Sequence, residues 1–120
     1  MRVRIAATGL YTYPDVTVVC GEPKFEDEYF DTLLNPVVII EVLSPSTEAY
    51  DRGKKFEHYQ QIESLVEYLL IAQDSCSVEL FIRQGQAQWL YSAVHQLEGV
   101  VKLDSIGCEL TLKDVYAKVQ

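Results

Sequence analysis

The chain has 120 residues, of which 48% are hydrophobic and 11% aromatic, and its formal net charge at pH 7 is −8. This balance is typical of one globular domain, residues 1–120, and excludes a disordered or fibrous chain. The acidic charge argues against general affinity for nucleic acid, so a polyanionic substrate would need a local basic patch or bridging metal ions. The longest apolar run is far shorter than the roughly 20 residues of a membrane helix, and no apolar secretory segment opens the chain. We therefore expect no membrane partner and a cytoplasmic location.

The first third of the chain predicts strands and one acidic loop. Residues 2–6 alternate polar and apolar side chains, and residues 15–20 are rich in β-branched ones, so we expect these two segments to form a hairpin. Gly21 and Pro23 then begin a loop that extends to residue 34. Residues 36–44 are apolar at nearly every position, which predicts a central strand covered on both faces.

The rest of the chain predicts an alternation of helix and strand. The spacing of apolar side chains predicts a helix over residues 49–62, followed by a strand at 67–72 that runs parallel to the central strand. Residues 77–82 and 88–94 flank Gly85 and predict a hairpin. Residues 100–103 predict a short edge strand, and residues 112–117 a final helix that begins after Thr111.

Two carboxylates are unusual because they belong to strands that are otherwise apolar. Glu41 lies near the end of the central strand, where an ionised side chain costs several kcal/mol unless a cation, a metal ion or hydrogen bonds meet it. Asp15 lies at the start of the strand before it. If the two strands are neighbours, both carboxylates lie at one end of the sheet, and such hard oxygen ligands suit Mg²⁺ or Mn²⁺.

The helix after the central strand supplies basic side chains beside this end of the sheet. Lys55 and Tyr59 are four residues apart and share one helix face, whereas Lys54 points about 100° away. If Phe56 faces the sheet, the row that contains Lys55 borders the same face. We therefore favour Lys55 as the cation that reaches a water or a phosphate at the site. Tyr59 is better interpreted as a packing residue with a polar tip.

These residues together resemble the motifs of a known family. Pro14-Asp15, the run Glu41-Val-Leu-Ser-Pro-Ser-Thr47, and Asp51 with Lys55 and Tyr59 are similar to the bacterial putative restriction endonuclease family of the PD-(D/E)XK nuclease superfamily. The similarity extends over nearly the whole chain, to Leu110. It implies an α/β, restriction-endonuclease-like fold, in which helices flank a mixed β-sheet.

The resemblance also implies a catalytic site. Asp15, Glu41 and the carbonyl oxygen of Val42 would hold Mg²⁺ or Mn²⁺, and a lysine would orient or activate a water. In the superfamily pattern this lysine follows the second acid by two residues, a position that is Leu43 here. Members of the family supply the lysine from the following helix, which matches Lys55.

The chain starts directly at the first predicted strand, so the N-terminal helical region that relatives carry is expected to be absent. One sheet face would then be exposed, which predicts a homo-oligomer. The resulting prediction is a metal-dependent DNA endonuclease that hydrolyses phosphodiester bonds with a metal-activated water. The alternative is a catalytically inactive, truncated nuclease-fold protein that acts as an oligomeric or partner-binding module. The short N-terminus and the net charge of −8 favour this alternative.

Overall fold

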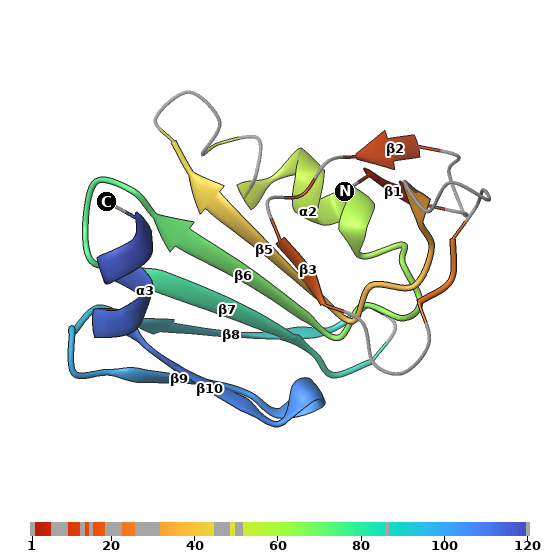
Figure 1. Cartoon of the computed structure of the whole chain (residues 1–120). Helices are drawn as coiled ribbons and strands as arrows, with labels where there is room; N and C mark the ends of the chain where they lie inside the picture. The colour runs from red at the N-terminus through yellow and green to blue at the C-terminus, as the bar shows by residue number, and fades with distance from the viewer. Residues whose placement is uncertain are drawn as a thin grey trace.

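A five-stranded mixed β-sheet forms the centre of the computed structural model (Figure 1). Its strands are β3 (Val16–Val18), β5 (Val38–Leu43), β6 (Glu67–Ala72), β7 (Val78–Arg83) and β8 (Trp89–Val94), which lie in the order β3-β5-β6-β7-β8. The structure describes residues 2–5, 10–12, 14, 16–18, 23–25, 32–44, 49, 52–85 and 87–119. The mixed sheet matches the expected fold class.

The pairing within this sheet follows the apolar pattern of its strands. β5 and β6 run parallel, as predicted for a crossover through the intervening helix, and all six residues of β6 are buried. β7 pairs antiparallel with both β6 and β8, so the predicted hairpin around Gly85 is confirmed. β3 is antiparallel to β5, with Val16 opposite Ile40.

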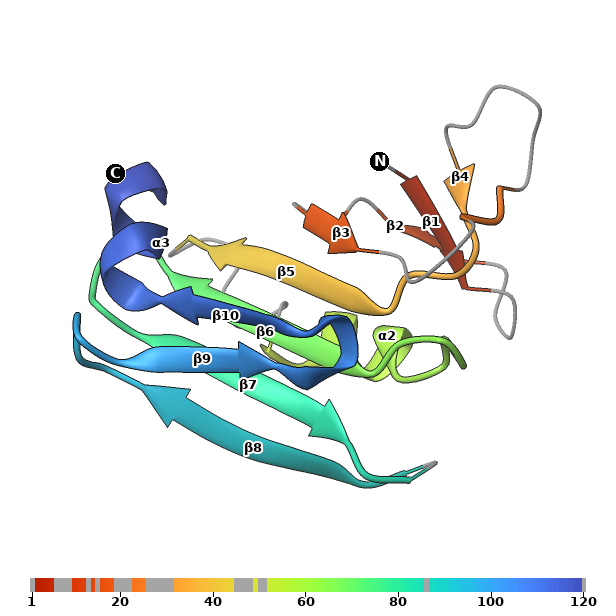
Figure 2. The same ribbon diagram turned by 60° about the horizontal axis from the view of Figure 1, so that its bottom comes forward.

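Different elements cover the two faces of the sheet, as Figure 2 shows. On one face lie α2 (Lys54–Tyr59) and a smaller sheet of β2 (Leu10–Thr12), β1 (Arg2–Ile5) and β4 (Thr32–Leu33). On the other face lie the hairpin of β9 (Val100–Leu103) and β10 (Cys108–Thr111), the short 3₁₀ turn η1 (Asp104–Ile106) and α3 (Leu112–Val119). Each face has its own cluster of buried apolar side chains.

Three predicted pairings or loops differ from the structure. β1 pairs with Leu10–Thr12, not with residues 15–20, because β3 instead pairs with the long apolar edge of β5. The predicted acidic loop contains β4, which pairs parallel with β1. Residues 100–103 do form a strand, but it pairs with β10, which the sequence did not predict. Gly107, whose φ is 60°, allows the chain to reverse between the two strands.

Both predicted segments contain helix. In the first, Ala49 and Arg52 are helical, and α2 spans Lys54–Tyr59 after Gly53, which has an irregular backbone conformation. α3 extends to Val119, and the backbone N–H of Asp114 donates to the Thr111 hydroxyl at 3.3 Å, as expected of a capping residue. Because described elements pack on both sheet faces, the fully exposed face expected from the sequence is not observed. Self-association itself stays a prediction.

Candidate functional site

Glu41 is a buried carboxylate in the middle of the apolar strand β5. Only 2% of the residue is exposed, and both carboxylate oxygens have partners. Lys55 Nζ lies 2.9 Å from Oε2, and the Tyr59 hydroxyl donates to Oε1 at 3.1 Å. A buried carboxylate requires such compensation, because its desolvation is otherwise too costly. Lys55 and the Tyr59 hydroxyl therefore offset the cost of burying the Glu41 carboxylate.

Helix α2 brings both partners to Glu41. The side chains of Phe56 and Tyr59 are buried against the sheet, with the Phe56 ring stacked 4.9 Å from that of Tyr68 and the Tyr59 ring 5.4 Å from the same ring. This packing fixes the rotation of the helix, so that Lys55 faces Glu41 while Lys54 is exposed. The structure therefore brings together Glu41, Lys55 and Tyr59, as the helical spacing indicated. Their catalytic role stays a prediction.

Arg83 of β7 holds the C-terminal end of α2 against the sheet. Its Nε donates to the carbonyl oxygen of Leu65 at 2.7 Å, and its Nη2 to those of Ile62 and Gln60 at 2.9 and 3.1 Å. These three carbonyl oxygens belong to the segment that connects α2 to β6. Burial lowers the pKa of the Arg83 guanidinium from its ordinary value. This contact helps to set the position of Lys55.

A second carboxylate on the same sheet face was not foreseen from the sequence. Glu79 of β7 accepts a hydrogen bond from the Tyr91 hydroxyl at 2.6 Å and forms an ion pair with Arg52. The signal was available, because Glu79 interrupts the apolar run Val78-Glu-Leu80 just as Glu41 interrupts its own strand. Glu67, also buried, accepts hydrogen bonds from Ser105 on the opposite face.

The remaining predicted ligands are described only in part. Asp15 lies outside the described residues, as does Asp51, which belongs to the family motif but was not a predicted ligand. Val42 follows Glu41 in β5 and pairs with Ile71 of β6. Within the described ranges, no group of three or more His, Cys, Asp or Glu side chains could hold a metal ion. The metal ligand set thus stays a prediction.

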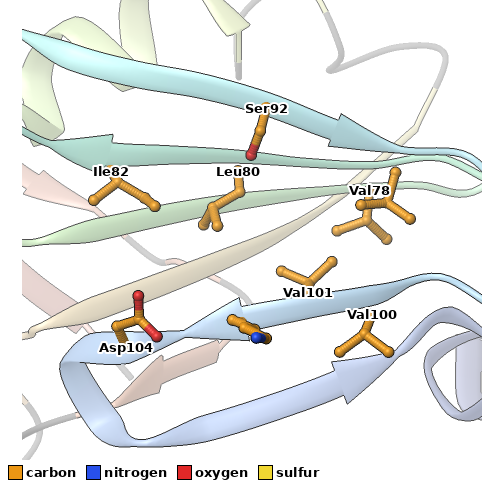
Figure 3. A pocket seen from close by; sticks show the side chains of 9 residues that line it. Val78, Leu80, Ile82, Ser92, Val100, Val101 and Asp104 are labelled. Atoms are coloured by element: carbon orange, nitrogen blue, oxygen red, sulfur yellow. The ribbon is translucent and has the colours of Figure 1, made fainter.

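An apolar groove of about 260 Å³ lies on the opposite face of the sheet, between β7, β8 and β9. Figure 3 shows side chains of the sheet pointing toward those of β9. The lining residues are Val78, Leu80, Ile82, Ser92, Val94, Val100, Val101, Lys102 and Asp104. None of them belongs to the Glu41 group, so this groove is separate from the candidate site.

A protein-family model matches most of the chain. The model of the Uma2 family, described as "Putative restriction endonuclease", matches residues 1–113. The chain belongs to the Uma2 family. The resemblance seen in the sequence motifs is thereby confirmed.

Two curated relatives come from Synechocystis sp. PCC 6803. The uncharacterized protein slr1290 is 38% identical over 119 residues, which are 97% of this chain and 60% of that protein. The uncharacterized protein sll1609 is 46% identical over 90 residues, which are 75% of this chain and 51% of that protein. The Uma2 chain thus spans between half and three fifths of the length of these relatives.

A solved structure shares the fold of this Uma2 protein. The crystal structure of a putative nuclease of DUF820 from Anabaena variabilis matches with a TM-score of 0.75 and 20% identity, over 99% of this chain and 66% of the other. This likeness confirms the α/β fold class with a mixed sheet that was expected from the sequence. Among the described helices, none is long and apolar enough to cross a membrane.

Proposed function

We propose that this Uma2 protein is a metal-dependent endonuclease that hydrolyses phosphodiester bonds of DNA. The observation that carries the proposal is the buried Glu41 with Lys55 and Tyr59 on its two oxygens, in a chain that belongs to a family described as putative restriction endonucleases. A carboxylate and an ammonium group at hydrogen-bond distance suit phosphodiester hydrolysis, which needs both a metal ligand and a positive charge near the phosphate.

Asp15, Glu41 and the carbonyl oxygen of Val42 are the proposed ligands of Mg²⁺ or Mn²⁺. Their oxygens fit, because Mg²⁺ usually takes one or two carboxylates and keeps several waters. Asp15 directly precedes Val16, which pairs with Ile40, the neighbour of Glu41. When bound, the ion would supply a Lewis acid that lowers the pKa of a water and offsets phosphate charge.

The protein's own groups have distinct proposed roles. Tyr59 holds one oxygen of Glu41 and thereby fixes the orientation of the carboxylate. Lys55 holds the other oxygen and keeps its ammonium group beside the site, where it can orient the attacking water or stabilise charge that develops on the phosphate. Burial of this group excludes bulk water and strengthens both electrostatic interactions.

Nicking of supercoiled plasmid DNA tests this function. We expect the unaltered chain to nick plasmid with Mg²⁺ or Mn²⁺ and to stop when the metal is chelated. Glu41→Gln should abolish nicking because it removes a metal-binding charge with little change in volume. Glu109→Gln, at an exposed position of β10, is the matched control and should nick normally.

Two outcomes would contradict the proposal. Equal nicking by the Glu41→Gln variant and the unaltered chain would remove Glu41 from the site. Absence of nicking by every folded variant, across metals and DNA substrates, would favour the alternative of an inactive nuclease fold that serves as a binding module.

A further inference from the structure

Glu79 stands in line with Glu41 on the same face of the sheet. Glu41 is opposite Leu70 in the β5–β6 register, and Leu70 is opposite Glu79 in the β6–β7 register. Residues directly opposite each other point to the same face, so the two carboxylates flank Leu70 at a backbone separation of roughly 10 Å, two strand spacings. The face therefore carries two acidic groups in one row.

Each of these carboxylates has a cation from the segment at the start of α2. Lys55 contacts Glu41, and Arg52, three residues earlier, contacts Glu79. The two pairs differ in exposure: 14% of the Lys55 side chain is exposed, against 36% for Arg52, while the Glu79 side chain is 11% exposed. The Lys55 pair is thus more enclosed than the Arg52 pair, whose arginine side chain is partly exposed.

Glu79 is arranged as a support for Arg52. Its Oε2 faces the guanidinium, and its Oε1 accepts the Tyr91 hydroxyl, so both oxygens are occupied. The hydrogen bond to Glu79, with burial as a smaller cause, raises the pKa of Tyr91, which keeps the hydroxyl protonated as a donor. The Tyr91 ring also packs 5.1 Å from that of Phe81, which fixes its direction.

The partly exposed Arg52 side chain has a chemistry that a nuclease requires. Arginine binds phosphate through a planar fork of N–H donors, and a fork fixed in advance loses less freedom on binding. Because the chain carries a net charge of −8, DNA must be held by local positive charge. Arg52 supplies a guanidinium at Glu79, which lies two strands away from Glu41, the group that we assign to catalysis.

We propose that Arg52, held in place by Glu79 and Tyr91, binds a backbone phosphate of DNA next to the phosphate that is cleaved. This assignment rests on the proposed nuclease function. Arg52 would contact substrate, whereas Glu79 and Tyr91 act through it as positioning residues. The same contacts would also tie α2 to β7, so the test must separate DNA binding from stability.

The test is the salt dependence of binding to a fluorescent DNA duplex, measured with Ca²⁺ in place of Mg²⁺ to prevent cleavage. We expect Arg52→Gln to weaken binding roughly tenfold and to lower the slope of log K against log salt by about one. Arg52→Lys keeps the charge and should retain the slope with reduced affinity. Lys113→Gln, an exposed cation on α3, is the matched control and should leave the slope unchanged.

Glu79→Gln separates positioning from net charge. A purely electrostatic effect predicts tighter DNA binding, because the variant is less acidic by one charge. Our proposal predicts weaker binding, because Arg52 loses its support, and in cleavage assays a higher KM with kcat nearly unchanged. Tyr91→Phe should act in the same direction without any change in charge, and thermal unfolding checks that each variant is folded.

The results can overturn the role of Arg52 separately from the proposed nuclease function. An unchanged slope in Arg52→Gln, or tighter binding by Glu79→Gln, would overturn the role of Arg52 while leaving the nuclease function intact if plasmid is still nicked. Failure of the unaltered chain both to bind and to nick DNA would overturn the two together.

Discussion

Glu41 is a buried charged side chain in an apolar strand. An isolated carboxylate in an apolar strand would be neutralised or would destabilise the fold, so it persists only with partners that match its two oxygens. Lys55 and Tyr59 provide them from one helix face. The arrangement stabilises a negative charge at a fixed place, which is what a metal ligand requires.

The variant Lys55→Met should be strongly destabilised. It leaves Glu41 buried without its cation, and breaking such a pair costs about 3 kcal/mol of unfolding free energy. Lys54→Met, the exposed neighbour, is the matched control and should unfold at nearly the same urea concentration as the unaltered chain. Urea unfolding measures both. Equal stability of the two variants would mean that Lys55 does not compensate Glu41 in solution.

The sequence predicted part of this site for physical reasons. An acid within an apolar strand signals a compensated charge, and helical spacing indicated that Lys55 rather than Lys54 faces it. Glu79 and Glu67 also interrupt apolar strands, but their partners differ. Glu79 contacts the guanidinium of Arg52, and Glu67 accepts a hydrogen bond from Ser105. Strand pattern alone cannot distinguish these partners, since they come from distant segments.

Among the secondary-structure elements, apolar runs predicted where strands form better than they predicted which strands pair. The continuous runs of β5 and β6 and the hairpin of β7 and β8 were recognisable because burial on both faces and a central Gly85 leave local signals. The antiparallel partners of β1 and β9 were not, although they follow closely in the chain, because β2 and β10 are short strands with few apolar residues. Gly107 was the local sign of the turn into β10.

Helix α3 is attached to the sheet through Tyr116, and this contact should be sensitive to alkali. The Tyr116 hydroxyl donates to the carbonyl oxygen of Ala72 at 2.7 Å and accepts the N–H of Ser77 at 2.9 Å. Burial raises the pKa of Tyr116, so the folded state holds the proton more tightly than the unfolded state. The stabilisation is complete below about pH 10 and is lost as the pH rises through the raised pKa.

Tyr116→Phe tests this attachment. We expect the variant to lose about 1–2 kcal/mol of unfolding free energy near neutral pH, because the backbone groups of Ala72 and Ser77 lose their partner. Its stability should also decline less steeply than that of the unaltered chain above about pH 10. Urea unfolding at several pH values measures both effects. Parallel pH profiles for the two proteins would contradict the assignment.

For the whole molecule, the two faces of the sheet have different properties. One face carries Glu41 and Glu79 with their cations under α2, and the other is covered by the β9–β10 hairpin and α3 over an apolar cluster. An acidic chain can act on DNA only where such local cations and a bound metal ion offset its charge. The proposed function therefore requires Glu41 to help bind a divalent ion.

Calorimetric titration with Mn²⁺ measures this binding without any knowledge of the DNA target. We expect the unaltered chain and the Glu109→Gln control to bind Mn²⁺ with the same affinity, and Glu41→Gln and Asp15→Asn to lose that binding. Equal binding of Mn²⁺ by Glu41→Gln and the unaltered chain, with both folded, would show that Glu41 is not a ligand of the ion.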